Sequence, residues 1–163
     1  MKTMCSLVFA FLLAAATTLQ AELPTKKILT LGLAKRLVAA AEAEAKKRGA
    51  TVVIAVVDDG GQLILLERLD DTQVASVEVA IGKARTAAIF RRPSKVFEDQ
   101  VKDGRVAALA LPGATPLQGG IPIAVEGKVI GAIGASGNSP QEDEEIALAG
   151  AAVTATAVQE EGR

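Results

Sequence analysis

The side chains that could do chemistry in this chain are few in kind. Its 163 residues contain no His, Tyr or Trp, and the only Cys is Cys5. Ser–His–Asp and Cys–His catalysis and zinc sites of the usual Cys/His type are therefore excluded. Any reaction or ligand contact must use charged, hydroxyl or amide side chains, or the backbone. No catalytic constellation of these types is visible, so the sequence assigns no enzyme activity.

A run of basic residues is the first candidate for ligand binding. No acidic residue occurs between Glu78 and Glu98, and the run comprises Lys83, Arg85, Arg91, Arg92 and Lys95. An arginine near a helix end can clamp a carboxylate or phosphate with two parallel hydrogen bonds. The alternative is a basic helix face that is simply solvated.

Glycines at two places are the second candidate. Gly119 and Gly120 precede an apolar strand, where free backbone N–H groups can form an anion-binding nest. The alternative is a turn that needs positive φ angles. Gly131, Gly134 and Gly137 occur within or just after a further strand, which indicates that another segment packs closely there.

Acidic residues supply the third candidate. Glu142 and Glu145 stand one helical turn apart and could hold a cation, although helix capping after Ser139 explains the same acids. Asp70 follows Arg68 after the first predicted hairpin, where the two form either part of a ligand site or a surface ion pair. The predicted ligand-binding residues are Arg68, Asp70, Lys83, Thr86, Arg92, Gly119 and Gly120, and the predicted metal-binding residues are Glu142 and Glu145.

The elements that must position these residues follow from hydrophobic periodicity and turn signals. Helices are predicted at residues 28–48, 72–91, 94–102 and 139–161, with Asp71 as a candidate N-cap of the second. Strands are predicted at residues 51–57, 62–69, 121–125 and 129–135, with an edge strand at 106–111. The plan is a single α+β domain with one antiparallel sheet of about five strands and helices packed on it.

The N-terminus has the pattern of a secretory signal peptide. Lys2 precedes a ten-residue apolar run at 7–16, too short to span a bilayer, and cleavage is predicted after Ala21. Residues 22–163 then form the mature domain, periplasmic or secreted, with no stable membrane insertion. A net charge of −1 argues against a general nucleic-acid binder.

Six motifs in order resemble the GlcG/HbpS-like haem-degrading family, which includes the C-terminal domain of some PduO-type corrinoid adenosyltransferases. They are Val56-Val57-Asp58 with Gly60-Gly61, Arg68-Leu69-Asp70, Lys83-Ala84-Arg85-Thr86-Ala87, Gly119-Gly120-Ile121-Pro122-Ile123, residues 131–137, and the acidic helix start at 141–145. The resemblance covers residues 28 to about 158. It implies a profilin/PduO-C-like layer fold, a five-stranded antiparallel sheet flanked by helices, and homo-oligomers, often octamers. It also implies that some members bind haem or corrinoid-type tetrapyrroles.

Three functions follow as hypotheses. The first is an exported oligomeric protein that binds haem, another tetrapyrrole or a small carboxylate. The second is a structural or sensor-associated oligomer without catalytic activity. The third is a haem-degrading or small-carboxylate enzyme with Lys83 or Asp70 as acid or base. The chain departs from relatives expected to place His near the iron, because it has none.

Overall fold

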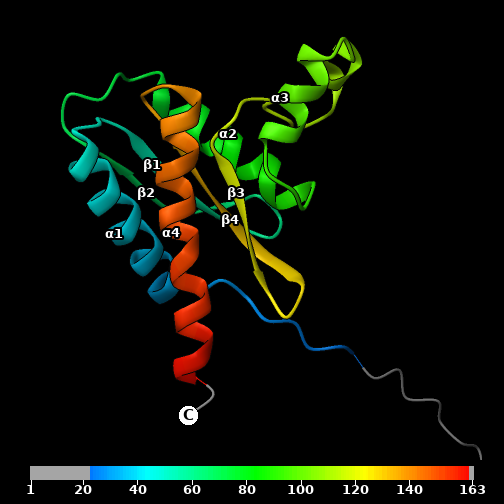
Figure 1. The fold of residues 1–163 in the computed structure, drawn as a ribbon. Helices are drawn as coiled ribbons and strands as arrows, with labels where there is room; N and C mark the ends of the chain where they lie inside the picture. Colours follow the sequence, from blue (N-terminus) through cyan, green and yellow to red (C-terminus); the bar gives the residue numbers. More distant parts are fainter. Residues whose placement is uncertain (1–22, 162–163) are drawn as a thin grey trace, which may run out of the picture.

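The computed structural model describes residues 23–161, so the predicted signal peptide lies outside the described residues. Figure 1 shows helices on either side of a sheet, with a short helical excursion at one end. The elements in chain order are α1 (Leu31–Arg48), β1 (Val53–Asp58), β2 (Leu63–Arg68), α2 (Ser76–Ile89), α3 (Lys95–Lys102), η1 (Val106–Ala110), β3 (Gly120–Val125), β4 (Lys128–Ser136) and α4 (Pro140–Glu161).

The sheet has four antiparallel strands in the order β2-β1-β4-β3. Each predicted hairpin forms, β1 with β2 and β3 with β4. The two hairpins join through β1 and β4, which pair from Val53 with Ser136 to Asp58 with Gly131. The α+β class and both hairpins are therefore confirmed.

The fifth strand was predicted at residues 106–111, and that prediction is wrong. This segment forms the 3₁₀ helix η1, which follows α3 in the excursion outside the sheet. Short apolar runs fit a strand and a helical turn equally well by periodicity. Val106 and Leu109 are exposed, so this apolar segment does not pack against a face of the sheet.

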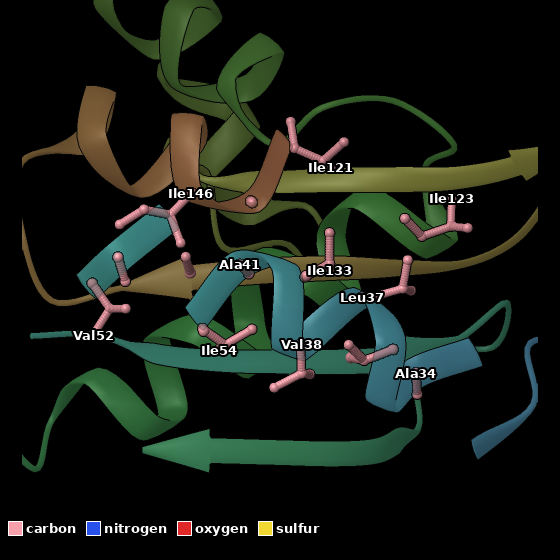
Figure 2. Packing of buried hydrophobic residues seen from close by; sticks show 14 of the residues in the cluster. Ala34, Leu37, Val38, Ala41, Val52, Ile54, Ile121, Ile123, Ile133 and Ile146 are labelled. Atoms are coloured by element: carbon pink, nitrogen blue, oxygen red, sulfur yellow. The ribbon is translucent and has the colours of Figure 1, made fainter. Parts of the chain in front are cut away.

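Helices cover both faces of the sheet. α1 and α4 cover one face, and Figure 2 shows Leu37, Val38 and Ala41 of α1 over Ile54 and Ile133 of the central strands. On the other face, alanines of α2 pack against alternate residues of β1 and β4. This arrangement explains why β1 is apolar on both sides of its pleat.

Glycines allow α2 to lie very close to the sheet. A Cβ at Gly134 would stand 2.4 Å from the carbonyl oxygen of Ala80 in α2. A Cβ at Gly120 would stand 2.1 Å from the carbonyl oxygen of Lys83. The close packing predicted from the strand glycines is thus confirmed, and its main partner is α2.

Helix ends follow their capping residues. The Thr30 hydroxyl accepts the Leu33 N–H, so α1 begins at Leu31 instead of residue 28. α2 begins at Ser76, and Asp71 lies in the preceding turn with φ 62°, so Asp71 is not its N-cap. Within residues 23–161, no helix is long and apolar enough to cross a membrane.

Candidate functional site

Lys83 is buried in the interior instead of facing a ligand pocket. Its side chain comes from the middle of α2, and the residue is 3% exposed. The ammonium donates to Asp143 Oδ2 at 2.7 Å and to the carbonyl oxygen of Ala135 at 3.0 Å. The pair therefore ties α2 to the start of α4 across the end of β4.

Asp143 is the partner that sequence patterning missed. It is one of several acids in the predicted acidic helix start at 141–145, and nothing in that pattern distinguishes it, whereas it is 2% exposed. Its Oδ1 also accepts the N–H of Asn138. Burial raises the pKa of Asp143, and the ammonium of Lys83 with the amides of Asn138 and Gly137 opposes this shift only in part.

Gly119 and Gly120 lie beside this ion pair, so the structure brings Lys83 and the two glycines together. Gly119 has φ 123°, and a Cβ there would stand 3.0 Å from Lys83 Nζ. The Gly120 N–H donates to the Ser94 hydroxyl, which donates to the carbonyl oxygen of Leu117. The Gly120 N–H is thus already bonded within the protein.

Thr86 is fully buried one turn after Lys83. Its hydroxyl donates to the carbonyl oxygen of Gly82 and accepts the N–H of Thr115 at 2.7 Å. A Cβ at Gly82 would collide with the Thr115 side chain. Thr86 therefore anchors the irregular segment before β3 onto α2.

Arg92 and the pair Arg68 and Asp70 lie elsewhere. The Arg92 guanidinium stands 5.9 Å from the ring centroid of Phe97, in cation–π range. Arg68 and Asp70 line a shallow hollow of about 490 Å³, together with the end of α1. No other predicted ligand residue lines that hollow.

The two predicted metal ligands already have protein partners. The Ser139 hydroxyl donates to the Glu142 carboxylate at 2.7 Å, and the Glu142 N–H donates back to that hydroxyl. Glu145 pairs with Arg48 of α1. Within residues 23–161, no group of three or more acidic or Cys/His side chains is arranged to hold a metal ion. The capping box is confirmed, and the metal site stays a prediction.

A cavity of about 650 Å³ lies at the tip of the β3–β4 hairpin. We call it the hairpin cavity, and its lining is residues 25–27, Asp59, Arg91 and residues 125–130. In Figure 1 the segment before α1 runs past this hairpin. Arg91 of the predicted basic run lines this cavity, but none of the seven predicted ligand-binding residues does.

Charge and apolar surface meet in the hairpin cavity. Lys26 pairs with Asp59 at 2.9 Å, and Lys27 pairs with Glu126 at 2.6 Å, which lowers the pKa of Glu126. Arg91 and Lys128 add two more positive charges, for four basic and two acidic groups in the lining. Val125, Val129 and Ile130 supply the apolar wall.

Comparisons with known proteins cover most of the described domain. The family model for the haem degrading protein HbpS-like family matches residues 29–152. Protein GlcG of Escherichia coli K12 is 45% identical over 112 residues, which are 69% of this chain and 84% of GlcG. The resemblance inferred from the motifs is confirmed.

Two solved structures share the fold. A double mutant of HbpS from Streptomyces reticuli has a TM-score of 0.76 and 34% identity, covering 82% of this chain and 91% of that chain. PduOC, crystallised as a complex with haem, has a TM-score of 0.71 and 27% identity, covering 77% and 94%. The architecture of four helices and one four-stranded antiparallel sheet is therefore of the HbpS and PduO C-terminal type.

Proposed function

The chain belongs to the HbpS-like haem-degrading family, and from that premise we propose that it is an exported, oligomeric protein that binds haem or a related carboxylate-bearing tetrapyrrole. The observation that carries the binding proposal is the hairpin cavity. Its volume of about 650 Å³ lies in the range of small-molecule sites. Its lining joins an apolar wall to a surplus of positive charge, which suits a flat apolar ring with acidic substituents. The haem complex of PduOC, a structural relative, supports the same choice of ligand.

The lining residues fit the edges of such a ligand better than its iron. The basic side chains of the lining would hold the propionate carboxylates, and Val125, Val129 and Ile130 would contact the ring. The usual haem ligands are His, Met, Cys and Tyr, and none occurs after Cys5. The cavity offers the iron only amine and oxygen donors. Haem, when bound, would supply an iron centre with weak axial ligation.

A haem titration of residues 22–163 tests this proposal. We expect a saturable one-site absorbance change and a predominantly high-spin spectrum, because no strong-field side chain can bind the iron. Added imidazole is expected to convert the spectrum to low-spin, since its nitrogen is a stronger ligand than an oxygen donor. A sharp low-spin spectrum without imidazole would show that a strong ligand exists. Absence of any haem or carboxylate binding would favour a structural or sensor-associated oligomer.

Export and oligomerisation complete the proposal. Export to the periplasm or medium is supported by the basic and apolar pattern of residues 1–21. Oligomerisation is supported by a row of exposed apolar side chains on α4, which includes Leu148, Ala152 and Ala155. This row flanks the hydrogen-bonding edge of β3, which has no neighbouring strand within residues 23–161.

Native mass spectrometry of protein made from the full gene checks both points. We expect subunits that lack residues 1–21, assembled into a closed homo-oligomer such as an octamer. The exposed small residues permit close approach between subunits, which explains why assembly is expected. A subunit that retains Met1 would contradict export with cleavage. A monomer at micromolar concentration would contradict the oligomer.

A further inference from the structure

One residue of the hairpin cavity, Arg91, has a left-handed backbone conformation outside a hairpin turn. Among the described residues, three that are not glycine have positive φ: Asp71 at 62°, Arg91 at 55° and Glu126 at 51°. Arg91 and Glu126 both line the hairpin cavity. The positive φ of Glu126 belongs to the two-residue turn Glu126-Gly127 that joins β3 to β4, whereas Arg91 lies in no such turn. Strained backbone is retained where another requirement outweighs its cost, and such positions cluster at ligand sites.

Arg91 occupies a position where glycine is the usual residue. α2 ends at Ile89 with Phe90 as its C-cap, so Arg91 is the next residue and adopts the left-handed conformation. Glycine enters this conformation without the Cβ penalty that arginine meets. The closing hydrogen bonds run from the Phe90 N–H to Thr86 and from the Arg91 N–H to Ala88, and they use only the backbone. The helix ending itself therefore has no need of an arginine side chain.

Arg91 and Lys128 are the two basic residues of the cavity lining without an ion pair in the described part of the chain, and Arg91 is the one that carries a guanidinium. Arg91 is exposed and makes no hydrogen bond or ion pair with any residue within 23–161. Lys26 and Lys27, by contrast, are matched by Asp59 and Glu126. A guanidinium presents two parallel N–H groups to a carboxylate, a geometry that an ammonium lacks.

We propose that Arg91 is the residue that recognises a carboxylate of the ligand, and that the cavity takes organic acids with two carboxylates on an apolar body. The second carboxylate would then meet Lys128, which lines the same cavity. This inference rests on the proposed function for its tetrapyrrole ligand. The recognition of a dicarboxylate by Arg91 is a separate claim, and the experiment keeps the two apart.

The test uses Arg91→Gly in the mature chain, with haem, haem dimethyl ester and succinate as probes. Without ligand, the thermal midpoint of Arg91→Gly is expected to rise by about 3 °C, because glycine relieves the left-handed strain. Its affinity for haem is expected to fall at least ~10-fold, because a charge-assisted hydrogen bond is lost. Haem dimethyl ester has no free carboxylate, so both proteins should bind it equally weakly.

Arg105→Ala is the matched control. Arg105 is exposed, lies in the α3–η1 excursion outside the cavity, and its removal changes net charge by the same amount. Its haem affinity should stay within about twofold of the unmodified protein, since a distant exposed charge is screened by salt. A general effect of net charge would instead weaken both variants together and would overturn the inference.

The remaining outcomes separate the two claims. If the unmodified protein and Arg91→Gly bind haem equally, the role of Arg91 is refuted and the proposed function stands. A third outcome is that the unmodified protein binds no haem, while succinate raises the thermal midpoint of the unmodified protein but not that of Arg91→Gly. In that case the Arg91 site stands and the tetrapyrrole function fails. If neither ligand acts on either protein, both claims fail. A lower midpoint in Arg91→Gly would show that Arg91 serves stability, which also overturns the inference.

Discussion

Replacing Lys83 with methionine is expected to destabilise the protein by about 3–5 kcal/mol, the range found when one partner of a buried ion pair is removed. Methionine fills a similar volume, but it leaves the Asp143 carboxylate buried, at 2% exposure for the residue, and without its cation. The Ala135 carbonyl oxygen also loses a donor. Urea unfolding followed by circular dichroism gives the free energy of unfolding.

Two comparisons make this expectation specific. Lys95→Met removes an equally short Lys–Asp pair, but Lys95 and Asp99 are both 40% or more exposed, so its effect should stay below about 1 kcal/mol. The double variant Lys83→Met/Asp143→Asn should cost less than the sum of its single variants, because the second change removes the uncompensated charge. Equal effects of Lys83→Met and Lys95→Met would contradict the role assigned to burial.

The same pair has a pH signature. Because burial raises the pKa of Asp143 in the folded protein, the folded state binds this proton more readily than the unfolded chain. The contribution of this carboxyl to stability therefore falls as pH rises from its unfolded pKa to its folded pKa. Asp143→Asn should remove that slope, measured as unfolding free energy against pH in the acidic range.

Replacing Gly134 with alanine is expected to destabilise the protein by about 3 kcal/mol or more, at the upper end of the range for overpacked cores. The new Cβ would stand 2.4 Å from the carbonyl oxygen of Ala80 and 2.7 Å from the amide nitrogen of Ala84. Both are backbone atoms of α2, so a rotamer change cannot relieve the collision. The helix must move off the sheet, and its alanine contacts with β1 and β4 must open.

Gly32→Ala is the matched control for Gly134→Ala. Gly32 lies in the first turn of α1, and a Cβ there would meet only the Thr30 hydroxyl at 3.8 Å. Alanine favours the helix, so Gly32→Ala should be neutral or stabilise by up to about 1 kcal/mol. Thermal unfolding of both variants measures the difference. A stable Gly134→Ala protein would show that α2 is not held against β4 as the structure has it.

Much of the fold could be predicted because local signals agree with one another. Both hairpins have turn glycines between alternating or buried apolar runs, and α4 has a Ser139 cap with Glu142 three residues later. The segment at residues 106–111 lacks turn or capping signals that agree with its apolar pattern. Its apolar run has no turn partner, and in the structure it contacts α3.

The candidate site was harder to predict, since its residues are brought together by the tertiary fold. Lys83 was singled out for its charge, but no pattern in the sequence pairs it with Asp143 on another helix. The structure places it in a buried ion pair, and its role in ligand binding stays a prediction. Arg91 belonged to the same basic run without being selected, because its left-handed backbone depends on where α2 ends.

The join between β1 and β4 has a consequence for how the chain folds. Each hairpin forms from neighbouring strands, but the central pairing brings together residues from opposite ends of the domain. α1 and α4, which pack against each other, likewise come from opposite ends of the domain. Closing so long a loop costs chain entropy before the contacts of the core form. This cost slows folding in proteins that are dominated by contacts between residues far apart in the sequence. We therefore expect the chain to be most open to association with other unfolded copies before β1 and β4 pair, since its apolar segments are then exposed to water.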